Sequence, residues 1–145
     1  MPTRSASASA ERQIYGARVF ERASVEIVPL VDVTYDPALP DEALRELAAL
    51  LPDVISMAVD CPEEPWAGPL GVGDLEIRFH AKRALDVGEL NCVIEVRTKL
   101  FPSRERDKQR RADLIRNEIS SRIELGAFGV WLILAEGAWA QASEG

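Results

Sequence analysis

The stretch that decides the fold is residues 75–82, which read LEIRFHAK. Apolar and polar side chains alternate along it, so it predicts a β-strand with one buried face and one polar face. Residues 93–100, which read VIEVRTKL, alternate in the same way and place three charged side chains on the polar face. A sheet with so many charges on one face predicts contacts with other chains in an oligomer, or a polar binding site.

The residues before this stretch predict a strand and a helix. Residues 24–35 are rich in β-branched and aliphatic side chains and predict a strand, in which Pro29 requires a sheet edge or a bend because it lacks an N–H donor. Apolar residues then recur at helical spacing from Leu44 to Ala58. Pro52 interrupts this helix, so a kink or a break is expected just before it.

The residues after 93–100 repeat the order of helix and strand. Ser103 is the expected N-cap of a helix that runs to Leu125 and is stopped by Gly126. Residues 128–135 are apolar on both faces, which predicts a strand covered on both sides. The chain therefore consists of two β-α-β units. We expect an α+β fold in which two helices cover one face of a four-stranded sheet.

Length and composition indicate a single globular domain. The chain has 145 residues, 47% of them hydrophobic, and no apolar run approaches the roughly 20 residues that cross a bilayer. We expect a partly disordered N-terminal extension over residues 1–23, a domain over residues 24–140 and a tail over residues 141–145. Cys61 and Cys92 make no disulfide framework and indicate small buried residues in a reduced, cytoplasmic protein. The net charge of −7 argues against a nucleic-acid partner.

Four short motifs follow one another along the chain. They are PLVDVTY at residues 29–35, Leu39-Pro40, Ile77-Arg78 with Arg83 five residues later, and KLFPSR at residues 99–104. Together with the repeated β-α-β order, they resemble the tautomerase superfamily, which includes macrophage migration inhibitory factor and 4-oxalocrotonate tautomerase. Within it, the 5-carboxymethyl-2-hydroxymuconate isomerase branch is the most similar. The resemblance covers residues 29–140. It implies the tautomerase fold and, with the charged sheet face, a homotrimer whose sheet faces pack around a threefold axis.

The resemblance also implies a site. In this family an N-terminal proline with a free secondary amine is the catalytic base, and arginines hold the substrate carboxylate. Pro29 matches the proline, and Arg78 and Arg104 match two substrate-binding arginines. Pro29 follows 28 residues, so its nitrogen is an amide without a basic lone pair. Three interpretations follow: another base replaces the amine; catalysis is lost and the fold serves binding or assembly; or Pro2, exposed by removal of Met1, enters the pocket.

Side chains near the expected pocket offer a replacement base. His80, the single histidine, lies on a polar strand face and can act as a base near pH 7, or it is an exposed or interface histidine. Asp32 and Glu95 are alternative bases if they are desolvated, and ordinary surface carboxylates otherwise. Tyr35 can donate a hydrogen bond to an enolate, or it is a plain aromatic residue at a strand end. With one histidine and no cysteine cluster, neither a metal site nor a cofactor is expected.

These residues favour an isomerase or lyase that acts on a small enolisable carboxylic acid. Its expected catalytic residues are His80, Tyr35 and Asp32, and its expected substrate-binding residues are Arg78, Arg104 and Pro29. The alternative is a catalytically inactive tautomerase-like protein for binding or assembly, in which residues 13–28 fill the pocket with Phe20 or Tyr15. The expected partners are a small carboxylate or enol-type ligand and further copies of the chain in a trimer, with no nucleic acid and no membrane.

Overall fold

The structure is a computed structural model of the 145-residue chain, and it describes residues 29–64 and 75–142. The chain divides into two compact units, one of residues Val28–Glu136 and one of residues Met1–Ile27 with Gly137–Gly145. In the second unit the structure describes residues 137–142, which form no helix or strand, and the Trp139 indole N–H donates to Gln141 Oε1 at 3.0 Å. The expected extension of residues 1–23, with Pro2, Tyr15 and Phe20, lies outside the described residues.

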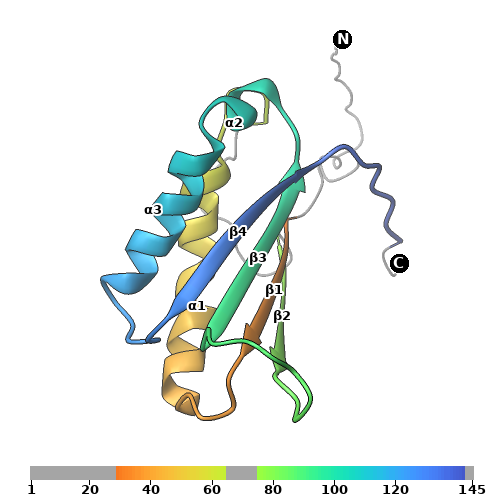
Figure 1. Cartoon of the computed structure of the whole chain (residues 1–145). Coiled ribbons are helices and arrows are strands. Elements are labelled where there is room, and N and C mark those ends of the chain that lie inside the picture. The colour runs from red at the N-terminus through yellow and green to blue at the C-terminus, as the bar shows by residue number, and fades with distance from the viewer. Residues whose placement is uncertain (1–28, 65–74, 143–145) are drawn as a thin grey trace. The chain divides into compact units, whose positions relative to one another are not determined.

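The unit of residues Val28–Glu136 contains one mixed sheet and its helices. In chain order the elements are β1 (Leu30–Tyr35), α1 (Asp41–Val59), β2 (Glu76–Ala81), β3 (Cys92–Lys99), α2 (Pro102–Arg106), α3 (Lys108–Ser120) and β4 (Phe128–Ala135). The strand order is β2-β1-β3-β4; β1 and β2 are parallel, β3 and β4 are parallel, and β1 and β3 are antiparallel. Two β-α-β units thus lie side by side, and α1 and α3 cover the same face of the sheet (Figure 1). The predicted α+β architecture is confirmed.

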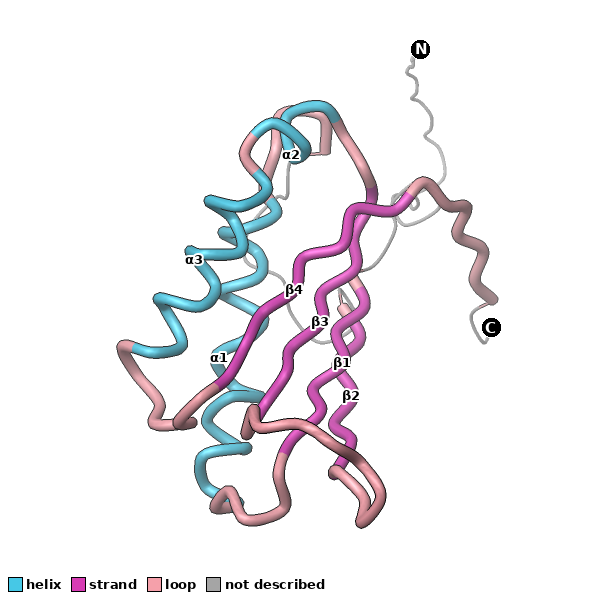
Figure 2. The backbone as a smooth tube through the Cα atoms, in the orientation of Figure 1, coloured by secondary structure: helices cyan, strands magenta, loops and turns pink. Residues whose placement is uncertain are grey.

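The sheet forms one layer and the two long helices form a second layer beside it (Figure 2). The core lies between these two layers. In β1 and β3 every second side chain points toward the helices. Apart from Tyr35 at the end of β1, these side chains are at most 1% exposed. The core residues that are completely buried include Val33, Leu47, Leu51, Ile55, Ile94, Ile115 and Ile119. Burial of each such side chain contributes about 1.5–3 kcal/mol. The sheet is therefore fixed against α1 and α3, and its other face is left for further contacts.

The break expected before Pro52 is not found, because α1 runs through this residue from Asp41 to Val59. Proline removes the N–H that would bond to the carbonyl of Ala48, one turn earlier. Ala48 lies on the exposed side of the helix, where water can donate to that carbonyl. On the opposite side, Leu51 and Ile55 are completely buried and hold both halves of the helix on the sheet.

The second predicted helix is divided into α2 and α3 at Asp107, and α3 ends at Ser120, before the expected Leu125. Ser103 is not the N-cap, because Pro102 begins the helix one residue earlier, as its fixed φ favours at a first helical position. The Ser103 hydroxyl instead donates to the carboxylate of Glu63.

The cover predicted for both faces of β4 is not found among the described residues. β4 is an edge strand, and Trp131 on its outer face is 63% exposed. Leu132, on the opposite face, is buried in the core. The apolar side chains on the outer face of β4 therefore remain available for contact with another chain.

Candidate functional site

The face of the sheet that points away from α1 and α3, here called the open face, gathers the charged side chains of the strands. The register of the sheet and the alternation of side chains place on it Asp32 and Thr34 of β1, Glu76, Arg78 and His80 of β2, Val93, Glu95, Arg97 and Lys99 of β3, and Trp131 and Ile133 of β4. The polar side chains that alternate along residues 75–82 and 93–100 thus lie on one shared surface, the open face.

Four of these side chains, here called the Asp32 network, form a chain of polar contacts across three strands. His80 Nε2 lies 2.9 Å from Asp32 Oδ1, and Arg97 Nη1 donates to Asp32 Oδ2 at 3.0 Å. Arg97 Nη2 donates to Glu95 Oε1, also at 3.0 Å. Both oxygens of the Asp32 carboxylate are therefore engaged, one by the histidine and one by the arginine.

The electrostatics of Asp32 follow from these contacts. The hydrogen bond with His80 lowers the pKa of Asp32, and that with Arg97 lowers it further, while partial burial opposes both. The carboxylate consequently stays ionised at neutral pH. In a neutral His80 it favours the tautomer with the proton on Nε2, which leaves the lone pair on Nδ1. With Nε2 bonded to Asp32, Nδ1 is the nitrogen of His80 that can accept a proton from a ligand.

Arg78 lies beside this pair on the open face. Its Cα is the register partner of Asp32 in β1, and it is two residues from His80 on β2. Its side chain is 58% exposed and approaches Glu76 Oε1 at 3.8 Å. The structure thus brings Asp32, His80 and Arg78 together: a polarised imidazole next to an exposed guanidinium that can bind a carboxylate bidentately.

Tyr35 does not join them, because it is three residues from Asp32 and points to the helix side of the sheet. Its ring lies 6.3 Å from that of Phe79, at 60°, and both rings line an open, mainly apolar groove of about 280 Å³. Leu44 and Arg45 of α1 line the same groove. A hydrogen bond from Tyr35 to an enolate held by His80 would have to cross the sheet, so the catalytic role expected of Tyr35 is not supported.

Pro29 is buried immediately before β1, where its carbonyl accepts the Glu76 N–H at 3.0 Å. It needs no donor at this position, because the parallel pairing of β1 and β2 uses its carbonyl. Pro29 therefore starts the strand, and nothing in this geometry makes its amide nitrogen a base.

Arg104 is 0% exposed, and its guanidinium is held entirely by the protein. Nε donates to the carbonyl of Val59 at 2.7 Å, Nη1 to that of Lys99 at 2.8 Å, and Nη2 to the carboxylate of Glu64 at 3.1 Å. A ligand cannot reach this side chain. The substrate-binding role expected of Arg104 is therefore corrected to a structural one.

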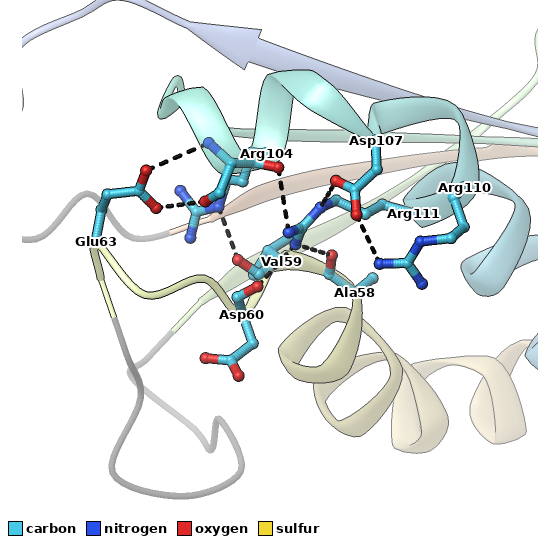
Figure 3. A network of polar contacts seen from close by, with 9 residues as sticks. Ala58, Val59, Asp60, Glu63, Arg104, Asp107, Arg110 and Arg111 are labelled. Atoms are coloured by element: carbon cyan, nitrogen blue, oxygen red, sulfur yellow. Dashed lines mark hydrogen bonds and ion pairs between the residues drawn. The ribbon is translucent and has the colours of Figure 1, made fainter.

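A second arginine, Arg111 of α3, shares this role. Arg111 Nη1 donates to the carbonyls of Ala58 and Asp60, each at 2.8 Å, and Nε donates to Asp107 Oδ1 at 2.6 Å. Figure 3 shows both guanidinium groups meeting the carbonyls at the end of α1. These carbonyls have no partner within the helix, and α1 has no basic residue of its own in its last turn. Arg104 and Arg111, here called the arginine pair, thus cap α1 and offset its dipole.

Cys61 and Cys92 are both free and buried, as expected for small core residues. Burial raises the pKa of the Cys92 thiol to about 11, so it stays protonated at neutral pH. In the described parts of the chain, no group of three or more His, Cys, Asp or Glu side chains is placed to hold a metal ion. No helix there is long and apolar enough to span a bilayer.

No family model matches the sequence, and no curated protein matches it either. Several solved structures are similar to it. Leishmania major MIF2 has 16% identity and a TM-score of 0.44, over 79% of this chain and 95% of that chain. A 5-carboxymethyl-2-hydroxymuconate isomerase from Deinococcus radiodurans R1 has 14% identity and a TM-score of 0.48, over 84% and 95%. A protein of unknown function from Vibrio cholerae O1 biovar eltor str. N16961 has 13% identity and a TM-score of 0.45, over 86% and 91%.

Proposed function

We propose that the chain is a tautomerase-superfamily isomerase or lyase for a small enolisable carboxylic acid, with His80 as its base. The observation that carries the proposal is the 2.9 Å contact between His80 Nε2 and Asp32 Oδ1. It orients the imidazole and stabilises its protonated form, which are the two requirements of a general base. No free proline amine is needed.

The proton movement proposed for a ketonisation uses three side chains. His80 Nδ1 accepts the proton of the enol hydroxyl as the C=O bond forms, and the imidazolium returns a proton to the carbon of the former C=C bond. Asp32 stabilises the imidazolium, and Arg78 holds the substrate carboxylate through paired hydrogen bonds. The proton count balances, because the base is neutral before and after the reaction. No metal or cofactor takes part in this step.

We propose that three copies pack with their open faces around a threefold axis. The exposed Trp131 and the mixed charges of the open face support this arrangement, because assembly would bury an apolar side chain and bring opposite charges together. Removing water from the open face would also strengthen the contact of His80 with Asp32.

The free, buried Cys61 and Cys92 support the proposed reducing, cytoplasmic location.

The second candidate is a catalytically inactive protein for binding or assembly. It is favoured by the burial of Arg104, because one of the two arginines that the resemblance assigns to the substrate is occupied by main-chain carbonyls and Glu64. In this case Arg78 alone would attract a carboxylate to the open face.

Ketonisation of phenylenolpyruvate and of 2-hydroxymuconate tests the two candidates. We expect the parent to be active, and His80→Gln, which keeps a donor for Asp32 but removes the base, to lose about 10²-fold or more in kcat. Arg78→Ala should raise KM about tenfold or more through loss of a charge-assisted contact, while Arg83→Ala, an exposed arginine on the following loop, should leave both constants within twofold.

The other outcomes are equally informative. Full activity in His80→Gln would exclude His80 as the base. A chain that begins at Pro29 tests the ancestral mechanism, since activity in it alone would require the free proline amine. A folded parent that converts neither substrate, like its variants, would support the inactive binding protein.

A further inference from the structure

The edge of the sheet at β2 carries backbone groups that the described residues do not pair. β2 is an edge strand whose partner in the sheet is β1. The N–H groups of Glu76 and Lys82 donate to carbonyls of Pro29 and Tyr35, so the even-numbered residues of β2 direct their backbone groups toward β1. In a parallel ladder the alternate residues direct theirs to the opposite side. Ile77 and Phe79 therefore present N–H and C=O groups at the free edge.

An edge of this kind is a template for another strand, and natural proteins usually protect it. The side chains at this edge do not repel an extended strand, because they alternate between apolar and charged residues of both signs. Glu76 and Arg78 are 54% and 58% exposed, and their closest approach to each other within the strand is 3.8 Å. Each is thus available to an opposite charge on a neighbouring chain.

We propose that β2 pairs antiparallel with β2 of a second copy, which joins two sheets across a twofold axis that passes beside Ile77. The outward backbone groups restrict the pairing to registers in which odd-numbered residues face odd-numbered residues. With Ile77 opposite Ile77, Leu75 faces Phe79, and Glu76 faces Arg78 in the two closely spaced positions that lack backbone bonds. Over residues 75–79, each side chain then meets an apolar or oppositely charged partner.

The other registers that the backbone allows are less favourable in charge. Pairings centred on Glu76, Arg78 or His80 place two identical ionisable side chains opposite each other. A pairing centred on Phe79 places Glu76 opposite Lys82, but it also places Arg78 opposite His80, which are both basic. Charge complementarity therefore selects the register with two reciprocal contacts between Glu76 and Arg78.

The backbone groups of this contact lie at the edge of the sheet, whereas the side chains of Glu76 and Arg78 lie on the open face, and Arg78 is also the proposed substrate-binding residue. The Arg78 guanidinium has five N–H donors, so a contact with Glu76 of the second copy leaves donors for a substrate carboxylate. The assembly can consequently be tested by mass alone, whether or not the chain is an enzyme.

The experiment is a charge exchange followed by native mass measurement at micromolar concentration. Glu76→Arg places like charges opposite each other twice, and so does Arg78→Glu. We expect the parent to have an even multiple of 16.0 kDa and each single variant to have half the mass of the parent. The double variant Glu76→Arg/Arg78→Glu, and an equimolar mixture of the two single variants, should both return to the parent mass.

Glu89→Arg, the same charge change on an exposed loop, should retain the parent mass. Far-UV circular dichroism checks that the single variants are folded, as expected from the exposure of both side chains. A parent that is a monomer or a trimer would overturn the proposal, and so would single variants that keep the parent mass. A mixture that stays at half mass would exclude the register.

Discussion

Arg104 illustrates how a charged residue can be a core residue. It is completely buried, yet its three nitrogens meet two carbonyls and the carboxylate of Glu64, which is itself only 7% exposed. The charge is thus neutralised, and one of the contacts satisfies the Val59 carbonyl at the end of α1, which no helical hydrogen bond can reach. Loss of such a side chain destabilises the fold mainly because the buried groups that it contacts are left without hydrogen-bond partners.

Replacing Arg104 by alanine should lower the free energy of unfolding by about 3–5 kcal/mol, because it leaves Glu64 and two carbonyls buried without their partner. Urea denaturation followed by tryptophan fluorescence measures the change. Arg106→Ala, two residues away and exposed, is the matched control and should change the free energy by no more than about 0.5 kcal/mol. Equal losses in the two variants would show that Arg104 has no special structural role.

At the scale of elements, the Glu63 side chain joins the segment after α1 to Ser103 in the first turn of α2. The Glu63 carboxylate accepts hydrogen bonds from the hydroxyl and the backbone N–H of Ser103. The Ser103 hydroxyl is the largest cause that lowers the pKa of Glu63, from 4.5 to about 2. Because the pKa is lower in the folded protein, this contact stabilises the fold above pH 4.5, and its contribution is lost as the pH falls toward 2.

Glu63→Gln should therefore make the stability less dependent on pH in the acidic range. The difference in unfolding free energy between the parent and the variant is expected to be constant above pH 5 and to shrink between pH 4.5 and 2. Denaturation curves over this range measure it. Ser103→Ala should flatten the dependence in the same way, and adding it to Glu63→Gln should have little further effect, since the two groups act as a pair. A difference that stays constant down to pH 2 would contradict this account.

At the scale of the whole molecule, the open face combines a polar network with an exposed apolar margin. Trp131 is 63% exposed on β4, and the Asp32 network lies on the neighbouring strands of the same sheet. Aromatic residues and arginine are enriched at subunit interfaces, so this composition is more typical of an interface than of a solvent-exposed sheet face.

Trp131→Lys should prevent the proposed threefold contact and reduce the mass measured by sedimentation equilibrium to a third of that of the parent. The reason is that a charge would replace an aromatic anchor at a face that assembly buries. Leu85→Lys is the control, since Leu85 is 93% exposed but lies on the loop after β2. A parent and a Trp131→Lys variant of equal mass would rule out the threefold contact through this residue.

The sequence predicted the fold well because alternation and helical spacing are local signals. Residues 75–82 and 93–100 became strands with the faces that their patterns indicated. The separation of Tyr35 from Asp32 was also readable, since residues three apart in a strand point to opposite faces. The motif at residues 29–35 therefore directs Asp32 and Tyr35 to opposite faces of the sheet.

The contacts of Arg97, Arg104 and Arg111 could not be predicted from such local patterns in the sequence. Arg97 meets Asp32, a residue 65 positions earlier, and this depends on the antiparallel register of β1 and β3. Arg104 and Arg111 stand in a run of charges that is typical of a solvated surface. Their partners include backbone carbonyls of Ala58 and Val59, which no residue type in the sequence indicates and which come close only when α2 and α3 pack at the end of α1.

The arginine pair also makes the first β-α-β unit dependent on residues synthesised after it. When α1 leaves the ribosome, the carbonyls of Ala58, Val59 and Asp60 lack the guanidinium groups that later cap them. Some fifty residues separate Val59 from Arg111. At ordinary elongation rates their synthesis takes about 3–10 s, and during this time the carbonyls at the end of α1 are not yet capped by both arginines. During this interval β1 also lacks its partner β3, and α1 lacks its contacts with α3. The nascent chain is therefore most exposed to aggregation and to chaperones between the two repeats, and we expect it to reach its native state only when the second repeat has emerged.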